Sequence, residues 1–158
     1  MGGFFTEEDI EALGQFGNRV LDRVDYMFWI NKTEAEPMYL IDSVILGFGD
    51  EGVLELVVND EGDGIDLGGK DYEQEQIKLD EEFQGKICYE KIEASQLKAW
   101  KEHIGQSLLQ IDLLTEDKKK FKNEGLIFKF EVGRVGLSVF NDELKTVALE
   151  DEAEEDEM

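Results

Sequence analysis

Residues 38–58 read MYLIDSVILGFGDEGVLELVV, and this stretch decides the fold class. Two runs rich in β-branched and aromatic residues, 38–48 and 53–58, flank the glycine-rich turn 49–52. Such runs, bounded by glycine and aspartate, are typical of a β-hairpin. Residues 47–52 match G-x-G-x-x-G literally, but the dinucleotide motif needs a helix after its turn and a strand-like run follows here. We therefore expect antiparallel strands.

A second hairpin of the same pattern occurs later in the chain, with predicted strands at 126–131 and 135–140. Residues 44–61 align with 126–143 without a gap. The seven identical pairs are Ile45/Ile127, Phe48/Phe130, Val53/Val135, Val57/Val139, Asn59/Asn141, Asp60/Asp142 and Glu61/Glu143. The alignment predicts two similar hairpins, each leading into an Asn-Asp-Glu turn. Chance resemblance between two amphipathic hairpins is the alternative.

The segments around the hairpins complete an α+β pattern. Residues 6–9, Thr-Glu-Glu-Asp, have the signature of a capping box, and apolar residues at helical spacing behind them predict a helix over 7–30. We further expect a short helix over 94–104, strands over 83–91, 108–114 and 146–149, and a charged turn over 115–125. The predicted fold is an N-terminal helix packed on a mostly antiparallel sheet with two similar hairpins.

Length and charge indicate one domain with an acidic tail. The chain has 158 residues, with 39 acidic and 16 basic side chains and a net charge of −23. Seven of the eight residues in 150–157 are acidic, which predicts a disordered tail over 150–158. Without those seven acids the remaining 32 still exceed the 16 bases, so the domain at 1–149 has a net charge of −16.

Composition excludes several classes of protein. A surface this negative repels nucleic acid phosphates and anionic membranes. No apolar stretch approaches the roughly 20 residues that span a bilayer, and the N-terminus lacks the positive region of a secretory signal. Cys88 is the only cysteine, so neither an internal disulfide nor a multi-cysteine metal site can form. We expect a cytoplasmic protein that binds neither nucleic acid nor membrane directly.

The residues that could carry chemistry favour structural interpretations. Cys88 lies in a strand-like apolar run typical of an inert thiol, and His103 lies near a predicted helix end where an imidazole meets carbonyl groups. The loop 59–66 has oxygen ligands at calcium-like spacing, but Lys70 stands where the bidentate glutamate belongs. A solvated acidic turn is the favoured interpretation, and cation binding there stays open. No catalytic residue, cofactor or metal ligand is predicted, and we expect a protein that is not an enzyme.

The charge itself points to a basic partner. A broad negative potential steers basic proteins and raises their association rates. Immunity proteins present carboxylates to toxic nucleases, DNA mimics such as anti-restriction and anti-CRISPR inhibitors copy phosphate spacing, and acidic chaperones shield basic clients. An acidic surface that serves solubility alone is the alternative to all three.

A pattern of hydrophobic residues and glycines favours one of these classes of acidic protein. Its residues are Leu97, Trp100, Ile104, Gly105, Leu108, Leu126, Ile127, Phe128, Phe130, Val135 and Leu137. Over residues 38–149 this pattern resembles small bacterial immunity-type proteins of polymorphic toxin systems. The resemblance implies a toxin partner. It identifies no contact residue, because such families vary most where they touch the toxin.

We therefore expect a non-enzymatic acidic protein that neutralises a basic bacterial toxin by occupying its active-site or nucleic-acid cleft. A DNA-mimic inhibitor and an acidic cytosolic domain of unrelated role are the alternatives. Aromatic side chains are frequent anchors at interfaces. The candidate partner-binding residues are Asp60, Glu61, Asp63 and Asp66 in the first acidic loop, Asp142 and Glu143 in the second, and Trp29 at the apolar end of the first predicted helix.

Overall fold

A computed structural model describes residues 5–59, 62, 64–68, 71–117, 120–140 and 143–149. In spatial order, sheet A contains β1 (Arg19–Val20), β7 (Ser107–Asp117), β8 (Lys120–Phe130), β9 (Arg134–Phe140) and β10 (Glu143–Leu149). Sheet B contains β5 (Ile65–Leu67), β4 (Val53–Val58), β3 (Met38–Gly47), β2 (Arg23–Asn31) and β6 (Ile87–Glu93). The helices are α1 (Glu7–Gly14), α2 (Tyr72–Phe83) and the short 3₁₀ segments η1 (Gly49–Glu51) and η2 (Lys101–His103).

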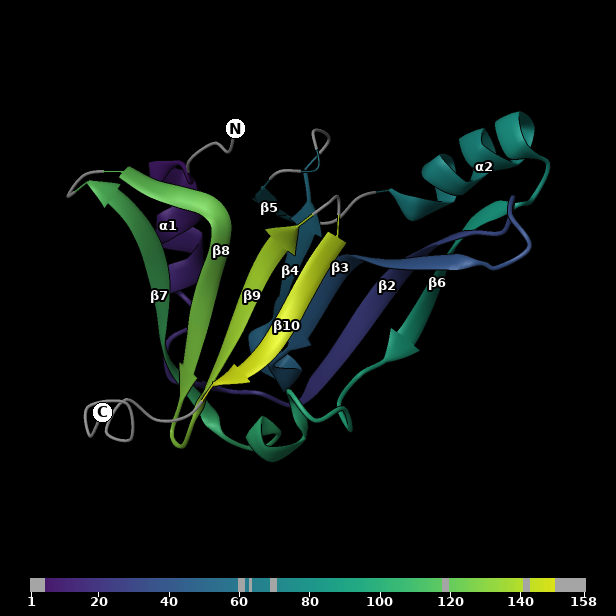
Figure 1. The fold of residues 1–158 in the computed structure, drawn as a ribbon. Coiled ribbons are helices and arrows are strands. Elements are labelled where there is room, and N and C mark those ends of the chain that lie inside the picture. The colour runs from purple at the N-terminus through teal and green to yellow at the C-terminus, as the bar shows by residue number, and fades with distance from the viewer. Residues whose placement is uncertain are drawn as a thin grey trace.

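The predicted α+β class with antiparallel pairing is confirmed, but the strands form two five-stranded sheets instead of one (Figure 1). The core lies between the sheets, because buried side chains of β2, β3 and β4 cluster with those of β7, β8 and β9. Each sheet thus buries one apolar face against the other, the usual solution for two layers. Among the described residues, no helix is both long enough and apolar enough to span a membrane.

The N-terminal helix is real but much shorter than predicted. Its capping box forms: the Thr6 hydroxyl accepts from the Asp9 main-chain N–H at 3.1 Å, and the Thr6 N–H donates to Asp9 Oδ2 at 3.0 Å. The helix ends at Gly14, and Asn18 has a left-handed φ of 68° that breaks any helical continuation. The prediction of helix over residues 15–30 is wrong, because β2 is a strand with apolar side chains on both faces. Such a run also satisfies helical spacing.

Both predicted hairpins form, but their second strands are not equivalent. Ile45 lies opposite Glu55 in the first hairpin, so the gap-free alignment places Ile127 opposite Leu137 in the second. Ile127 instead pairs with Gly136. The registers therefore differ by one residue, which turns every side chain of a strand to the other face. Accordingly, Val53 is 56% exposed whereas its aligned counterpart Val135 is fully buried.

Two other predicted segments differ from the structure. Residues 94–100 form turns ahead of η2 instead of a helix, and they carry the buried Trp100 across the end of the core. The predicted charged turn over 115–125 is largely strand, because β7 and β8 pair as far as Asp117 opposite Lys120. Charged residues suit an exposed hairpin end as well as a turn, so composition did not separate the two.

A buried polar network joins the sheets near the middle of the molecule. The Tyr26 hydroxyl in β2 accepts a hydrogen bond from Trp100 Nε1 at 2.7 Å and lies 2.9 Å from Thr146 Oγ1 in β10. Beyond this network, β2, β3 and β6 continue past β10 toward α2 (Figure 1). That end of sheet B is therefore covered by elements other than sheet A, or left open.

Candidate functional site

Most of the predicted acidic site lies outside the described residues. This applies to Asp60, Glu61, Asp63 and Asp142, and also to the acidic tail over 150–158. Asp66 is exposed in β5, the edge strand of sheet B. Glu143 is half-buried in β10, the edge strand of sheet A, with its carboxylate 3.7 Å from Lys145 Nζ. The two described acids therefore belong to different sheets.

Trp29 lies in a strand and not in a helical turn. It is half-buried in β2, opposite Leu40 of β3 and Tyr89 of β6. Directly opposite residues share one face of a sheet. We call this side of sheet B, which points away from sheet A, the outer face, and the side that carries Tyr26 the inner face.

One row of residues crosses the whole outer face. Its members, one from each strand, are Asp66, Val57, Ser43, Met27 and Lys91. The predicted residues Asp66 and Trp29 therefore lie on the same face, although in different rows. The centre of the row is covered, since Ser43 is fully buried and Val57 is 5% exposed. Helix α2 provides part of this cover.

Helix α2 was missed by sequence reasoning, and its cap is the signal that could have identified it. Asp71 accepts a hydrogen bond from the Gln74 N–H at 3.2 Å, as an N-cap residue does. Tyr72, Gln76, Leu79 and Phe83 follow at helical spacing and are all half-buried. The apolar stripe is weak because a glutamine and a tyrosine occupy half of it.

Gln76 and Tyr72 fasten α2 to sheet B. The Gln76 side chain donates to the Ile87 carbonyl at 3.1 Å and accepts from the Tyr89 N–H at 2.8 Å. The Tyr72 hydroxyl lies 2.8 Å from Asp42 Oδ2 and 3.0 Å from Ser43 Oγ, and its ring meets that of Tyr89 edge-on at 4.7 Å. The helix is thus held by directional contacts rather than by a large apolar interface.

The two tyrosines at this junction stay protonated. Burial raises the pKa of Tyr72 well above its usual value, and the neighbouring Asp42 carboxylate raises it further, although the Ser43 hydrogen bond acts against this. Burial, with Asp42 and Glu75 nearby, also raises the pKa of Tyr89. Neither phenol is a ready base or nucleophile, so the cluster is suited to holding α2 rather than to catalysis.

A groove of about 500 Å³ runs between α2 and the outer face. Its lining residues are Met27, Tyr72, Glu73, Gln76, Ile77, Tyr89 and Lys91. Ile77 is 51% exposed at its rim. The next row of the outer face contains Glu55, Asp25 and Glu93, and Arg23 binds the Asp25 carboxylate through Nε at 3.0 Å. The α2 groove therefore combines an apolar lining with acidic neighbours.

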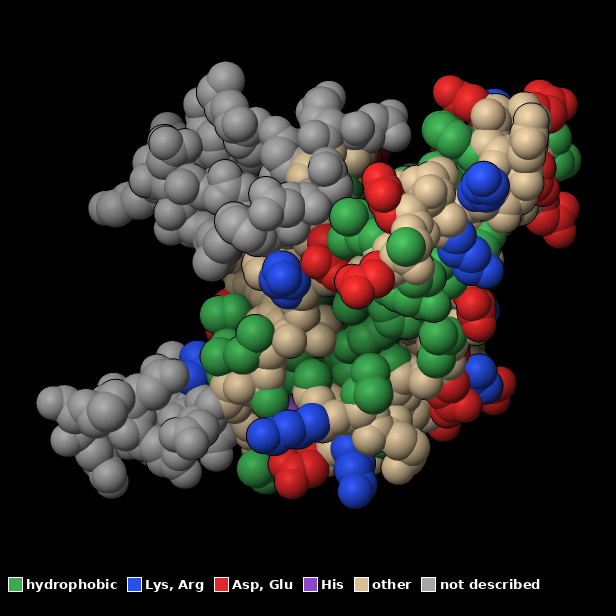
Figure 2. Space-filling view, turned by 45° about the vertical axis from the view of Figure 1, so that its right-hand side comes forward, with side chains coloured by type: hydrophobic (Ala, Val, Ile, Leu, Met, Phe, Trp, Pro, Cys, Tyr) green, Lys and Arg blue, Asp and Glu red, His purple; other side chains and the backbone are tan. Residues whose placement is uncertain are grey.

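The inner face at the same end carries a second apolar surface. It consists of Phe28, Tyr39, Ile41 and Ile92, which we call the aromatic face. Phe28 and Ile41 pack against the core, whereas Tyr39 is 54% and Ile92 44% exposed. The Phe28 and Tyr39 rings meet edge-on at 6.4 Å. Figure 2 shows hydrophobic side chains gathered below α2, with charged side chains around their margin.

Acidic residues predominate around both surfaces. Residues 71–93, which comprise α2, β6 and their connection, contain eight acids and three bases. Glu90 lies opposite Phe28 and so shares the inner face with the aromatic face. In α2 the last turn carries acids and no base, which is unfavourable beside the negative end of the helix dipole. This end of the molecule is therefore both apolar and negatively charged.

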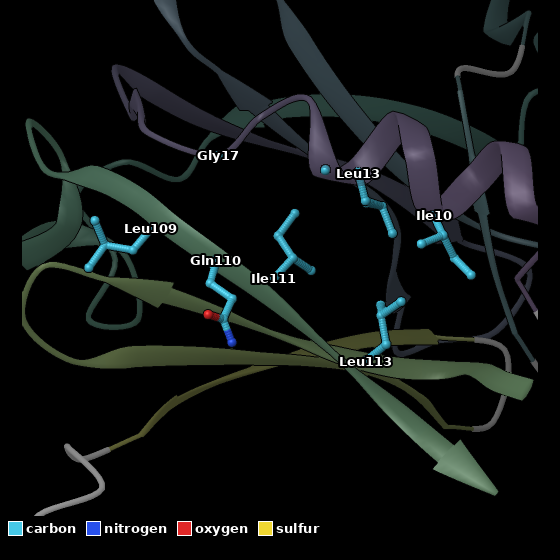
Figure 3. A pocket seen from close by; sticks show the side chains of 8 residues that line it. Ile10, Leu13, Gly17, Leu109, Gln110, Ile111 and Leu113 are labelled. Carbon is cyan, nitrogen blue, oxygen red and sulfur yellow. The ribbon is translucent and has the colours of Figure 1, made fainter. Parts of the chain in front are cut away.

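A second groove, between α1 and β7, lacks this combination of apolar surface and negative charge. Figure 3 shows Ile111 and Leu113 pointing from β7 toward Ile10 and Leu13 of α1, while Gln110 points to the other side of the strand. The groove has a volume of about 300 Å³, and none of its lining residues is charged. We interpret it as the junction where a short helix packs imperfectly on sheet A.

The potential catalytic residues lie apart in the fold. Cys88 is half-buried in β6, paired with Ile30 of sheet B. His103 is buried in η2, where its ring stacks on Phe130 of sheet A at 4.5 Å. Within the described ranges, no cluster of three or more His, Cys, Asp or Glu side chains could hold a metal ion. The possible cation site over 59–66 lies largely outside those ranges.

No protein-family model matches the chain, and no curated protein or solved structure matches it significantly. The functional argument therefore depends on the surfaces of the molecule itself.

Proposed function

We propose that this protein is a non-enzymatic binding protein for a basic protein partner, and that it serves as an immunity protein against a bacterial toxin. The aromatic face carries the proposal, since it leaves Tyr39 and Ile92 exposed on a protein of net charge −23. Exposed apolar patches on soluble proteins mark interaction sites. The toxin as partner is supported by the sequence resemblance to immunity-type proteins.

Charge and apolar surface have separate tasks in this proposal. The negative potential speeds the encounter with a basic partner and loses strength as salt screens it. Tyr39 then anchors the complex by burying its ring in the partner, while Glu90 presents a carboxylate on the same face. A toxin held in this way has its basic cleft covered, which blocks access of its substrate.

The test is capture of the partner from the source cells with three immobilised baits: wild type, Tyr39→Ser and Val132→Ser. Val132 is 63% exposed at the β8–β9 turn and serves as the matched control for loss of an exposed apolar side chain. We expect wild type and the control to retain one basic protein at about 0.1 M salt, with weaker retention at about 0.5 M. The Tyr39→Ser bait should retain much less.

Co-expression then separates the classes of partner. The captured protein should be toxic when produced alone, and wild type but not Tyr39→Ser should relieve the toxicity. A captured protein that binds duplex DNA and is displaced by it would favour the DNA-mimic alternative. Empty baits at both salt concentrations, or equal capture by Tyr39→Ser, would contradict the proposed function.

A further inference from the structure

The free edge of sheet B is only half covered. β6 is the last strand of that sheet. At its beginning, the Gln76 amide bonds the Ile87 carbonyl and the Tyr89 N–H, as a neighbouring strand would. Because alternate residues of a strand direct their main chain to the same side, the N–H and C=O groups of Lys91 and Glu93 also point to this edge. Within the described part of the chain, no main-chain group pairs with them there.

We infer that this open edge, from Lys91 to Glu93, binds an extended basic segment of the partner as an additional antiparallel or parallel strand. This inference rests on the proposed function and specifies how the partner is held. Strand addition to an exposed edge is a recurrent mode of peptide recognition, in which main-chain hydrogen bonds provide affinity and flanking pockets provide specificity.

An apolar surface lies on each side of the edge. On the outer face, the α2 groove lies beside the part of the edge that Gln76 does not cover. Ile77 and Lys91 are among the residues that line it. On the inner face, Ile92 of β6 is 44% exposed and continues the aromatic face. An added strand would therefore direct one apolar side chain into the α2 groove and the next toward Ile92.

Charge selects a basic strand over a second copy of this chain. The edge lies within residues 71–93, which contain eight acids and three bases. Glu90 and Glu93 belong to the edge strand itself, and the Glu93 carboxylate also lies 3.7 Å from Arg23. Lysine and arginine side chains on the added strand would lie beside these carboxylates. Two copies of the chain, each at −23, repel one another as they approach.

The test uses fluorescent peptides in which two consecutive apolar residues, chosen from leucine, valine and tyrosine, are flanked on both sides by lysine or arginine, titrated against the full-length protein. The critical variant is Lys91→Pro, which removes an edge-facing N–H without touching the bonds from β6 to β2. Lys91→Ala is the matched control for loss of the side chain. We expect anisotropy to report binding that is about tenfold or more weaker for Lys91→Pro than for Lys91→Ala, because both variants lack the lysine side chain and only the alanine variant keeps the N–H.

Two measurements keep the test independent of folding of the proline variant. Peptides N-methylated on the edge-facing amides should bind wild type about tenfold more weakly than unmethylated ones. Bound peptide should also slow amide exchange at Lys91 and Glu93 and shift the Met27 methyl signal in the α2 groove. Binding that survives both N-methylation and Lys91→Pro, or absence of binding across the peptide set, would overturn strand addition.

These outcomes are separable from failure of the proposed function. If wild type and Lys91→Pro capture the partner and Tyr39→Ser does not, the proposed binding function is supported and strand addition is contradicted. If no partner is captured but the peptides bind at the edge, the edge site is supported and the proposed cellular role is contradicted.

Discussion

Two tyrosines, Tyr26 in β2 and Tyr72 in α2, each join sheet B to a neighbouring element, and they do so in contrasting surroundings. Tyr26 is 3% exposed, and its hydroxyl joins the neutral groups of Trp100 and Thr146 between the two sheets. Tyr72 is only half-buried, and its hydroxyl meets the Asp42 carboxylate beneath α2. The first network lies inside a large apolar core, whereas the second fastens a helix none of whose residues is buried.

This contrast indicates which part of the molecule unfolds only globally and which part can open locally. Apolar burial dominates stability, so the Tyr26 end should unfold only with the whole domain. The α2 end depends on a few hydrogen bonds, each with a modest net contribution, so it should open locally. Both proposed binding surfaces lie at this second end. Variants that separate the two regions test the comparison directly.

The largest effect is expected for Trp100→Ala. Trp100 is fully buried and packs on Phe128 at a ring distance of 6.0 Å, so truncation leaves a cavity between the sheets. We expect a loss of about 3–5 kcal/mol in the free energy of unfolding. Urea denaturation measures this. Leu97→Ala is the control, because Leu97 is 48% exposed in the same segment, and an equal loss there would contradict the assignment of the core.

Tyr26→Phe should have the next largest effect. The change removes the acceptor of Trp100 Nε1 and leaves a buried donor without its partner. We expect global stability to fall by about 1–3 kcal/mol. In native-state hydrogen exchange the loss should extend over strands of both sheets, since the network joins them. Exchange that changes only near Tyr26 would mean that the network does not couple the sheets.

Tyr72→Phe should loosen α2 with a smaller effect on global stability. The variant keeps the edge contact with Tyr89 but removes the hydrogen-bonding hydroxyl from Asp42 and Ser43. We expect about 1 kcal/mol or less in urea denaturation. Amide exchange should accelerate in α2 while the amides of β2 to β4 keep their protection. Uniform acceleration throughout the domain would show that α2 is part of the core unit.

High pH should separate the two regions without a mutation. Folding raises the pKa of Tyr72, so its stabilisation of the docked helix is fully present below the ordinary tyrosine pKa of about 10. That contribution is lost as the pH rises further, because the open form releases the proton more readily. NMR of the protein with ring-labelled tyrosine should show that Tyr72 stays neutral past pH 10 until α2 opens. The Tyr72→Phe variant identifies the Tyr72 signal. Ionisation at the ordinary pH with α2 still docked would contradict this account.

Sequence reasoning located the elements whose signals are local. The capping box at Thr6, the two hairpins and the glycine-rich turn at 49–52 all depend on neighbours within a few residues. Reasoning was wrong for β2, because its residues 26–30 are all apolar and such a run fits a helical period as well as a strand. The candidate site could be predicted only in part, because the sequence does not show which apolar side chains are exposed. Trp29 was singled out as an aromatic residue at the apolar end of the first predicted helix, but Tyr39 and Ile77 resemble ordinary core residues until their exposure is seen.

By itself, the sequence determined the α+β class, the hairpins and a strong negative charge, since composition and short-range chain geometry are enough for each. Tertiary structure alone decided that the strands divide into two sheets, that the second hairpin pairs one residue out of register with the first, and that one end of sheet B extends past its partner. These outcomes depend on which distant strands meet. The burial of a side chain depends on which strands pack against it, and local residue spacing carries no information about that packing.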